Sequence, residues 1–195
     1  MIELLKKRRT QYALGRNLDI AETVIEDLAR EAIRWSPSPF NSQSSRVVFL
    51  FGNESEKLWS IVRREIAQIM SSDTLEQFLK KIDGFAAGVG TILFFEDEQT
   101  VLDLQEQWPL FADHFPDWSE QSGGMAQFAV WTALANVGVG ASLQHYNPLI
   151  DESVKKTWNL PVGWKLRAQM PIGSNEAPVP DKTFLPDALR FRSFR

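Results

Sequence analysis

The sequence contains no cysteine and only two histidines, and these shortages exclude several kinds of chemistry. Without cysteine the chain has no disulfide, no thiolate ligand for a metal and no cysteine nucleophile. The two histidines, His114 and His145, stand far apart in the sequence and leave a structural zinc site without a set of ligands. We therefore expect neither a structural metal site nor thiol chemistry.

Long apolar runs and an excess of positive charge are also missing. No apolar run approaches the length of a membrane-spanning helix, and the first residues, Met1–Lys7, lack the layout of a signal peptide. A net charge of −4 and a pI near 5.3 argue against nucleic acid or an anionic membrane as the main partner. The chain is therefore expected to be a cytoplasmic protein.

Two common active-site motifs are absent as well. There is no Gly-x-Ser-x-Gly elbow for a serine nucleophile, and no Gly-x-Gly-x-x-Gly follows a strand to bind a dinucleotide. The side chains form no convincing set of acid, base and nucleophile. This composition is compatible with an enzyme whose chemistry belongs to a bound cofactor.

The chain of 195 residues is long enough to bury a substantial core, and we expect a single domain over residues 1–195. Asp19 and Glu22 resemble a capping box at the start of the first long helix. Apolar spacing predicts helices over residues 20–35, 58–69, 75–82 and 125–137, and strands over residues 46–51, 89–95 and 164–172. Helices and strands do not alternate strictly, which favours an α+β fold over a doubly wound sheet.

A dense group of hydrogen-bonding side chains lies between the first long helix and an apolar run that reads as a buried strand. Residues 36–46 are rich in serine and include Asn41, Gln43 and Arg46. Such a loop can bind the edge of a heteroaromatic ring on which carbonyls and nitrogens alternate. An ordinary solvated connection is the alternative, because serine, proline and asparagine are common turn residues.

Two other segments have a similar polar character. Lys7–Thr10 ends a short N-terminal helix, and adjacent guanidinium groups followed by a hydroxyl are suited to holding a phosphate. A solvated basic run near a terminus is the more ordinary interpretation. The segment Gly138–Pro148 follows the apolar helix, contains His145 and ends in the turn signal Asn-Pro.

The order and spacing of these three segments resemble those of the FMN-dependent nitroreductase family. Within it, the chain is similar to a small branch of fungal fatty-acid-repression-mutant-like proteins and bacterial copper-induced nitroreductases. The resemblance implies a three-layer α-β-α fold with a mostly antiparallel central sheet. It also implies an obligate homodimer with two FMN sites, each built from both chains, in which a tail of about residues 174–195 packs on the partner.

The same resemblance assigns roles to individual residues. A backbone N–H beside the isoalloxazine is expected to face N5, and the imidazole of His145 could have no role of its own. The FMN contacts assigned in this way are Arg8, Arg9 and Thr10 for the phosphate and ribityl chain; Ser38, Asn41 and Gln43 for the polar ring edge and ribityl chain; Leu143, Gln144 and His145 beside the ring; and Lys182 and Arg190, with Arg192 as a further candidate, for the phosphate.

The match has a gap at the pyrimidine end of the ring. Many nitroreductases carry lysines there, at positions where this chain has Tyr12 and Ser44. A cation at this end stabilises the anionic reduced flavin, so its loss should lower the reduction potential unless Arg46 takes its place.

The aromatic residues between Glu96 and Gln121 allow two interpretations. The segment contains two prolines and is expected to be broken helix or loop. Its aromatic side chains either pack in the core or a dimer interface, or line a pocket for planar substrates; they are Trp108, Phe111, Phe115 and Trp118. The following Gly123-Gly124 pair is expected to start or bend a helix, because no Lys-Ser/Thr follows it as in a phosphate loop.

Three functions remain compatible with the sequence. The leading one is an FMN-dependent oxidoreductase that takes hydride from NAD(P)H and reduces nitroaromatic, quinone or similar planar acceptors in a ping-pong cycle. The alternative is a flavin-binding redox sensor or regulatory protein with slow, incidental reductase activity. A structural α+β domain without a cofactor is the third.

Overall fold

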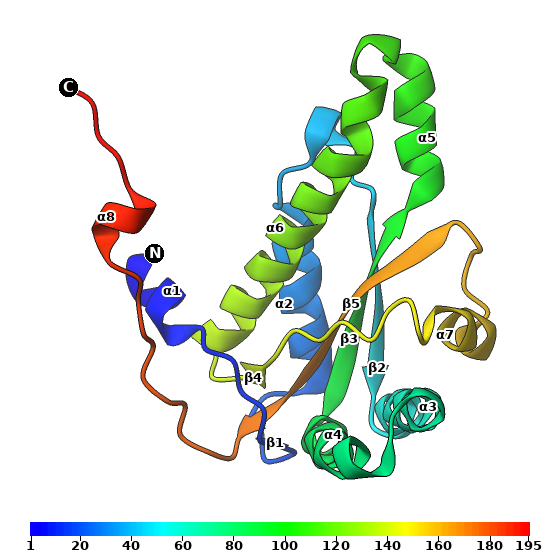
Figure 1. The fold of residues 1–195 in the computed structure, drawn as a ribbon, viewed down its shortest axis with the longest axis vertical. Helices are drawn as coiled ribbons and strands as arrows, with labels where there is room; N and C mark the ends of the chain where they lie inside the picture. The colour runs from blue at the N-terminus through cyan, green and yellow to red at the C-terminus, as the bar shows by residue number, and fades with distance from the viewer.

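The structure is a computed structural model that describes the backbone of residues 1–195 and every side chain except those of Ser72 and Asp73. Figure 1 shows the arrangement of its helices and strands. In chain order these are α1 (Ile2–Lys7), β1 (Leu14–Gly15), α2 (Glu22–Arg34), the 3-10 helix η1 (Pro39–Asn41), β2 (Ser45–Phe51), α3 (Asn53–Ile69), α4 (Ser72–Ala86), β3 (Gly90–Asp97), α5 (Glu98–Gln107), the 3-10 helix η2 (Pro109–His114), α6 (Phe115–Asn136), β4 (Gly140–Ala141), α7 (Asp151–Trp158), β5 (Trp164–Asn175) and α8 (Asp187–Arg190).

The middle layer is an antiparallel sheet in the order β1-β5-β3-β2, with β4 paired to the end of β5. The strand β3 is central and buried along nearly its whole length, as its continuous apolar sequence predicted. The strand β2 lies at the edge of the sheet and is mostly half-buried, with only Leu50 fully buried. The prediction that this strand is buried was therefore wrong, because β2 pairs with a neighbouring strand on one side only.

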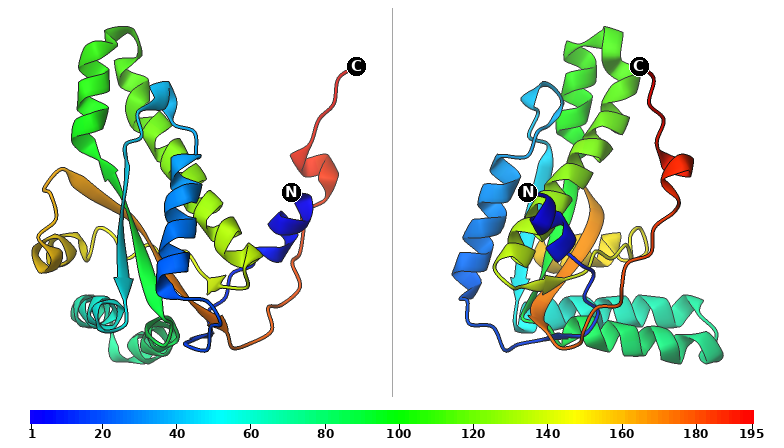
Figure 2. Two further views of the ribbon diagram at one scale, coloured as in Figure 1. Left: turned by 180° about the vertical axis from the view of Figure 1, so that it is seen from behind. Right: turned by 90° about the vertical axis from the view of Figure 1, so that its left-hand side faces the viewer.

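Helices cover both faces of the sheet, as the turned views in Figure 2 show. On one face α2 and α6 pack over a cluster that includes Ile25, Ile92 and Val130. On the other, α3, α4 and α7 pack over a cluster that includes Trp59 and Leu93. The three layers and the antiparallel sheet confirm the expected α+β, α-β-α fold.

Two predicted boundaries differ from the structure. The helix α2 begins at Glu22, and its N-cap residue Ala21 makes no side-chain capping bond, so the capping box predicted from Asp19 and Glu22 is wrong. The last strand extends to Asn175, three residues beyond the predicted end. Pairing with β1 and β4 explains this extension, because both short strands bond to its final residues.

The aromatic segment is a broken helix, as expected, in which α5, η2 and α6 follow one another. Pro109 and Pro116 lie in the first turns of η2 and α6, where a missing N–H removes no helical bond. Gly123 and Gly124 lie inside α6 and neither start nor bend it, contrary to expectation. A side chain added at Gly123 would have its Cβ 3.8 Å from the buried carboxylate of Glu96, an ordinary van der Waals contact, so space does not require a glycine there.

Beyond β5 the chain leaves the sheet as a tail that passes α1 and ends away from the other layers (Figures 1 and 2). Its large apolar side chains are between 58% and 93% exposed, and these are Phe184, Leu185, Leu189, Phe191 and Phe194. Within the described residues, no helix combines the length and the apolar character needed to cross a bilayer.

Candidate functional site

The basic segment after α1 lies against the C-terminal half of α6. The guanidinium carbon of Arg8 is 4.3 Å from the centroid of the Trp131 ring. The nearby Lys7 ammonium donates to the carbonyl oxygen of Asn136 at 2.8 Å, so α1 is held to α6 at two points. Partial burial lowers the pKa of Arg8, and the like charge of Arg9 adds to this. The Arg8 side chain is therefore a cation in an environment that lacks compensating charge.

A cavity of about 280 Å³ collects the predicted phosphate residues Arg8, Arg9 and Lys182. Its other lining residues are Ile2, Leu5, Lys6 and Phe184, so every charged side chain on its wall is a cation. Arg9 donates to the carbonyl of Pro180 and thereby ties the tail to the basic segment. The Nε atom of Arg8 is buried and has no hydrogen-bond partner among the described groups. A phosphate fits this donor set, because forked guanidinium groups and an ammonium are its usual ligands.

Arg190 and Arg192 do not reach this cavity. The guanidinium of Arg190 stacks 5.3 Å from the ring centroid of Phe191, its neighbour in the chain. That of Arg192 donates to the carbonyl of Ala188 at 2.7 Å. Within one chain the structure therefore brings three of the predicted phosphate cations together and leaves these two apart.

The segment that follows α6 runs between β5 and the basic segment. It leaves the helix through Gly138, whose φ of 84° is one that glycine adopts without strain. Thr10 pairs with Ala141 in a parallel bridge, and the N–H of Gln11 donates to the Ala141 carbonyl at 2.9 Å. These bonds place Thr10 and the end of α1 directly beside residues 140–144.

Leu143, Gln144 and His145 lie in three different environments. The backbone N–H groups of Ser142 and Gln144 both donate to β5, at 3.4 and 2.8 Å, so that of Leu143 points to the opposite side. The Gln144 side chain is buried and donates to the hydroxyl of Ser142, which leaves Leu143 as the better candidate for a backbone contact to flavin N5. His145 is exposed, and its pKa is lowered by partial desolvation and by the like charge of Arg167.

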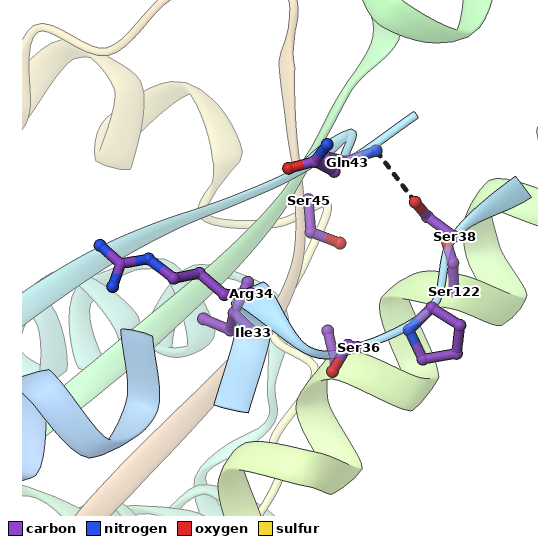
Figure 3. Close-up of a pocket in the computed structure, with 9 residues that line it drawn as sticks. Ile33, Arg34, Ser36, Ser38, Gln43, Ser45 and Ser122 are labelled. Atoms are coloured by element: carbon purple, nitrogen blue, oxygen red, sulfur yellow. Dashed lines mark hydrogen bonds between the residues drawn. The ribbon is translucent and has the colours of Figure 1, made fainter. Parts of the chain in front are cut away.

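The polar loop between α2 and β2 forms a second candidate region at the other end of α6. Ser36, Ser38 and Gln43 line a cavity together with Ser122 of α6 (Figure 3), and its volume is about 150 Å³. The backbone N–H of Gln43 donates to the hydroxyl of Ser38 at 3.0 Å, which closes the loop on itself. Asn41 is exposed beside this cavity, with its side chain available for binding.

The loop is held in an unusual backbone conformation. Phe40, Asn41 and Gln43 have φ angles of 53°, 53° and 49°, in the left-handed region that residues with side chains seldom adopt. Such conformations cost about 1–3 kcal/mol each and persist only where the surrounding structure imposes them. They are concentrated at functional sites, which supports a binding role for the loop over that of a solvated connection.

The aromatic segment provides the restraint on this loop. The ring of Phe40 packs against four aromatic rings of that segment, at centroid distances of 5.2 to 6.4 Å, and these are Trp108, Phe111, Phe115 and Trp118. Within one chain these residues therefore anchor the polar loop. Phe40 and Trp108 remain 50% and 41% exposed, so the cluster also has a face on the surface.

Arg46, the candidate for the place of the two lysines, is bonded to groups of the same chain. Its guanidinium donates to Asp97 at 2.7 Å and to the carbonyl of Gln43 at 2.6 Å, so it fastens the polar loop to β3. A different cation approaches the position of the first missing lysine, because the ammonium of Lys81 lies 4.8 Å from the ring centroid of Tyr12. The sequence offered no sign of this contact, which joins α4 to the segment after α1.

The two candidate regions lie apart in one chain. The polar loop contacts α6 at Ser122 and the basic segment contacts it at Trp131, nine residues further on. This separation is about 14 Å along the helix axis. The predicted phosphate cluster, formed by Arg8, Arg9 and Lys182, is adjacent to the Leu143 segment. Ser38, Asn41 and Gln43 are not brought to it.

Comparison with known proteins identifies the family and supports the fold. The sequence model of the nitroreductase family matches residues 5–174. CinD from Lactococcus lactis, solved in complex with chloramphenicol and with 4-nitrophenol, is 51% identical, with 100% of this chain and 99% of CinD covered and TM-scores of 0.91 and 0.90. The Saccharomyces cerevisiae protein HBN1 is 30% identical over 94% of this chain and 92% of its own length. Nitroreductase FRM2 from the same yeast is 27% identical over 96% and 94%.

Proposed function

The chain belongs to the nitroreductase family of oxidoreductases, and on this premise we propose that it is an FMN enzyme that uses NAD(P)H to reduce nitroaromatic compounds, quinones or similar planar acceptors. We further propose that it acts in the cytoplasm as a homodimer of single-domain chains.

The cationic cavity carries this proposal. Four cationic side chains line it, and Arg8 is stacked and half-buried, with no partner for its Nε atom among the described groups. A half-buried guanidinium without a carboxylate is unfavourable unless an anion joins it. The monophosphate of FMN has the charge and the acceptor oxygens to do so, whereas riboflavin has neither.

The rest of the flavin would extend from this cavity along residues 140–144. Thr10 lies beside this segment, and the Leu143 N–H points away from β5, where it can contact the ring edge. Bound FMN would supply the hydride chemistry, and the chain would bind it, orient it and set its electrostatic surroundings. In the proposed ping-pong cycle NAD(P)H gives up a hydride and leaves, and the acceptor then takes the same electron pair.

Two features support a homodimer. The polar loop and the phosphate cluster meet α6 about 14 Å apart along its axis, so a second chain related by twofold symmetry could bring its loop to the cluster of the first. The tail exposes five large apolar side chains, an arrangement that marks an interaction surface. We propose that the tail packs on the partner and that each site uses Arg8 and Lys182 of one chain and Asn41 of the other.

The class of acceptor follows from the relatives and from the aromatic surface. CinD was solved with 4-nitrophenol and with chloramphenicol, both nitroaromatic compounds. In this chain, the half-exposed rings of Phe40 and Trp108 stand beside Asn41, where a planar molecule could stack. Planar nitro compounds and quinones are therefore the acceptors we expect.

Steady-state kinetics test the proposal. The FMN-saturated protein should oxidise NADH or NADPH at a rate that rises severalfold when 4-nitrophenol, chloramphenicol or a benzoquinone is added. If the protein holds FMN tightly but the acceptor does not raise the rate of NADH or NADPH oxidation, the result would favour a redox sensor over an enzyme. A protein that binds no FMN at any concentration would contradict the proposal altogether.

A further inference from the structure

Trp131 has an environment that a purely structural core residue seldom shows. It lies on α6 with its ring 4.3 Å from the guanidinium carbon of Arg8. Its indole N–H is buried and has no hydrogen-bond partner among the described groups. Buried indole N–H groups usually find a partner, because leaving one unpaired is unfavourable. Two adjacent buried donors, this one and the Nε of Arg8, are therefore unused at the same place.

The stacking also restricts how Arg8 can bind a ligand. A guanidinium is planar and donates only in its plane, so a ring against its face leaves the donating edge free. The contact of Lys7 with Asn136 holds the backbone of this segment to the same helix. Arg9 and Lys182 line the cavity that Arg8 also lines. The Arg8 edge and the other two cations are thus presented to one ligand.

We infer that Trp131 is a positioning residue for the cofactor phosphate, whose ring fixes the Arg8 guanidinium in the orientation that the phosphate requires. This inference rests on the proposed FMN function and adds to it a residue that the sequence motifs do not contain. It makes a specific demand, because a residue that acts through Arg8 should affect the phosphate and not the flavin ring.

Binding of two flavins separates this role from a general effect on the fold. FMN and riboflavin share the ring and ribityl chain, and only FMN has the phosphate. Dissociation constants for both are measured by fluorescence titration of the apoprotein, for the wild type and for Trp131→Phe, Trp131→Leu and Arg8→Lys. Trp35→Leu is the matched control, because that tryptophan is 81% exposed and its N–H bonds to Glu31 of its own helix.

The inference predicts a graded loss for FMN alone. Trp131→Leu should weaken FMN binding about tenfold, because it removes the ring face that holds the Arg8 guanidinium. Trp131→Phe keeps a weaker ring face and should fall between Trp131→Leu and the wild type. Arg8→Lys keeps the charge but loses the planar group, and adding Trp131→Leu to it should then cost little more. Riboflavin binding should be unchanged in all of them.

Three results would overturn the inference. Wild-type FMN affinity in Trp131→Leu would do so, as would equal losses for FMN and riboflavin, which would mark Trp131 as a residue of the fold. Losses for Trp131→Leu and Arg8→Lys that simply add in the double variant would show that the two act independently. A wild-type protein that binds neither flavin would instead contradict the proposed function on which the inference rests.

Discussion

Removing the cations of the cavity should strip the protein of FMN while leaving it folded. The variants are Arg8→Ala, Lys182→Ala and the double variant. Hydrogen bonds to charged groups contribute about 1.5–3 kcal/mol, and 1.4 kcal/mol is a tenfold change in affinity, so Arg8→Ala should weaken FMN binding roughly 10- to 150-fold. Lys182 lies on the exposed tail, where solvent screens its charge, and its loss should cost about tenfold or less.

The assay is FMN binding to the apoprotein by fluorescence titration, together with the flavin content of the purified protein. The double variant should purify nearly colourless, with a melting temperature close to that of the wild-type apoprotein, because neither side chain is fully buried. Lys80→Ala is the control, since that exposed lysine pairs with Glu76 on α4. Raising the ionic strength should weaken FMN binding to the wild type more than to the double variant. Unchanged FMN occupancy in the double variant would refute the phosphate site.

Three further predictions address the loop, the tail and a buried acid. Asn41→Gly keeps the left-handed backbone that a leucine there would strain, and it should weaken FMN binding or shift the flavin spectrum with little change in apoprotein melting; an unaltered holoprotein with a destabilised apoprotein would make Asn41 a turn residue only. Deleting residues 183–195 should weaken dimerisation and FMN retention together, and light scattering that shows a flavin-saturated monomer of the full chain would exclude the shared site. Burial raises the pKa of Glu96, because desolvation penalises the charged carboxylate. The contribution of the protonated Glu96 to the stability of the fold is therefore fully present below the unfolded pKa and is lost as pH rises through the folded pKa. Glu96→Gln should therefore raise the melting temperature at neutral pH and not at about pH 4, whereas Glu98→Gln, at an exposed carboxylate, should show no such gain.

The sequence predicted the layers of the fold because the hydrophobic patterns of the long elements are strong. The central strand β3 is apolar on both faces, and the helices α3 and α4 carry clear apolar stripes. The errors arose where local patterns were overridden by packing. Gly123-Gly124 would weaken an isolated helix, but α6 continues through them because its buried residues, such as Ala126 and Val130, pack in the core.

The site was only partly predictable. The motifs predicted Arg8 and Lys182 as phosphate ligands although 174 positions separate them, and the structure places both on one cavity. The left-handed backbone of Phe40 could not be read from its side chain, because an aromatic residue has no preference for that conformation. Trp131 belongs to an apolar helix and was indistinguishable from a core residue until its contact with Arg8 was seen.

The central claim is that electrons pass from a nicotinamide nucleotide to a planar acceptor through FMN held by this chain. Anaerobic titration of the FMN-loaded protein with NADH and with NADPH, followed by 4-nitrophenol, tests it most directly. The account predicts that about one equivalent of at least one nucleotide per flavin bleaches the yellow absorbance within seconds, and that the acceptor restores it. Absorbance that neither nucleotide bleaches, or that the acceptor fails to restore, would contradict it.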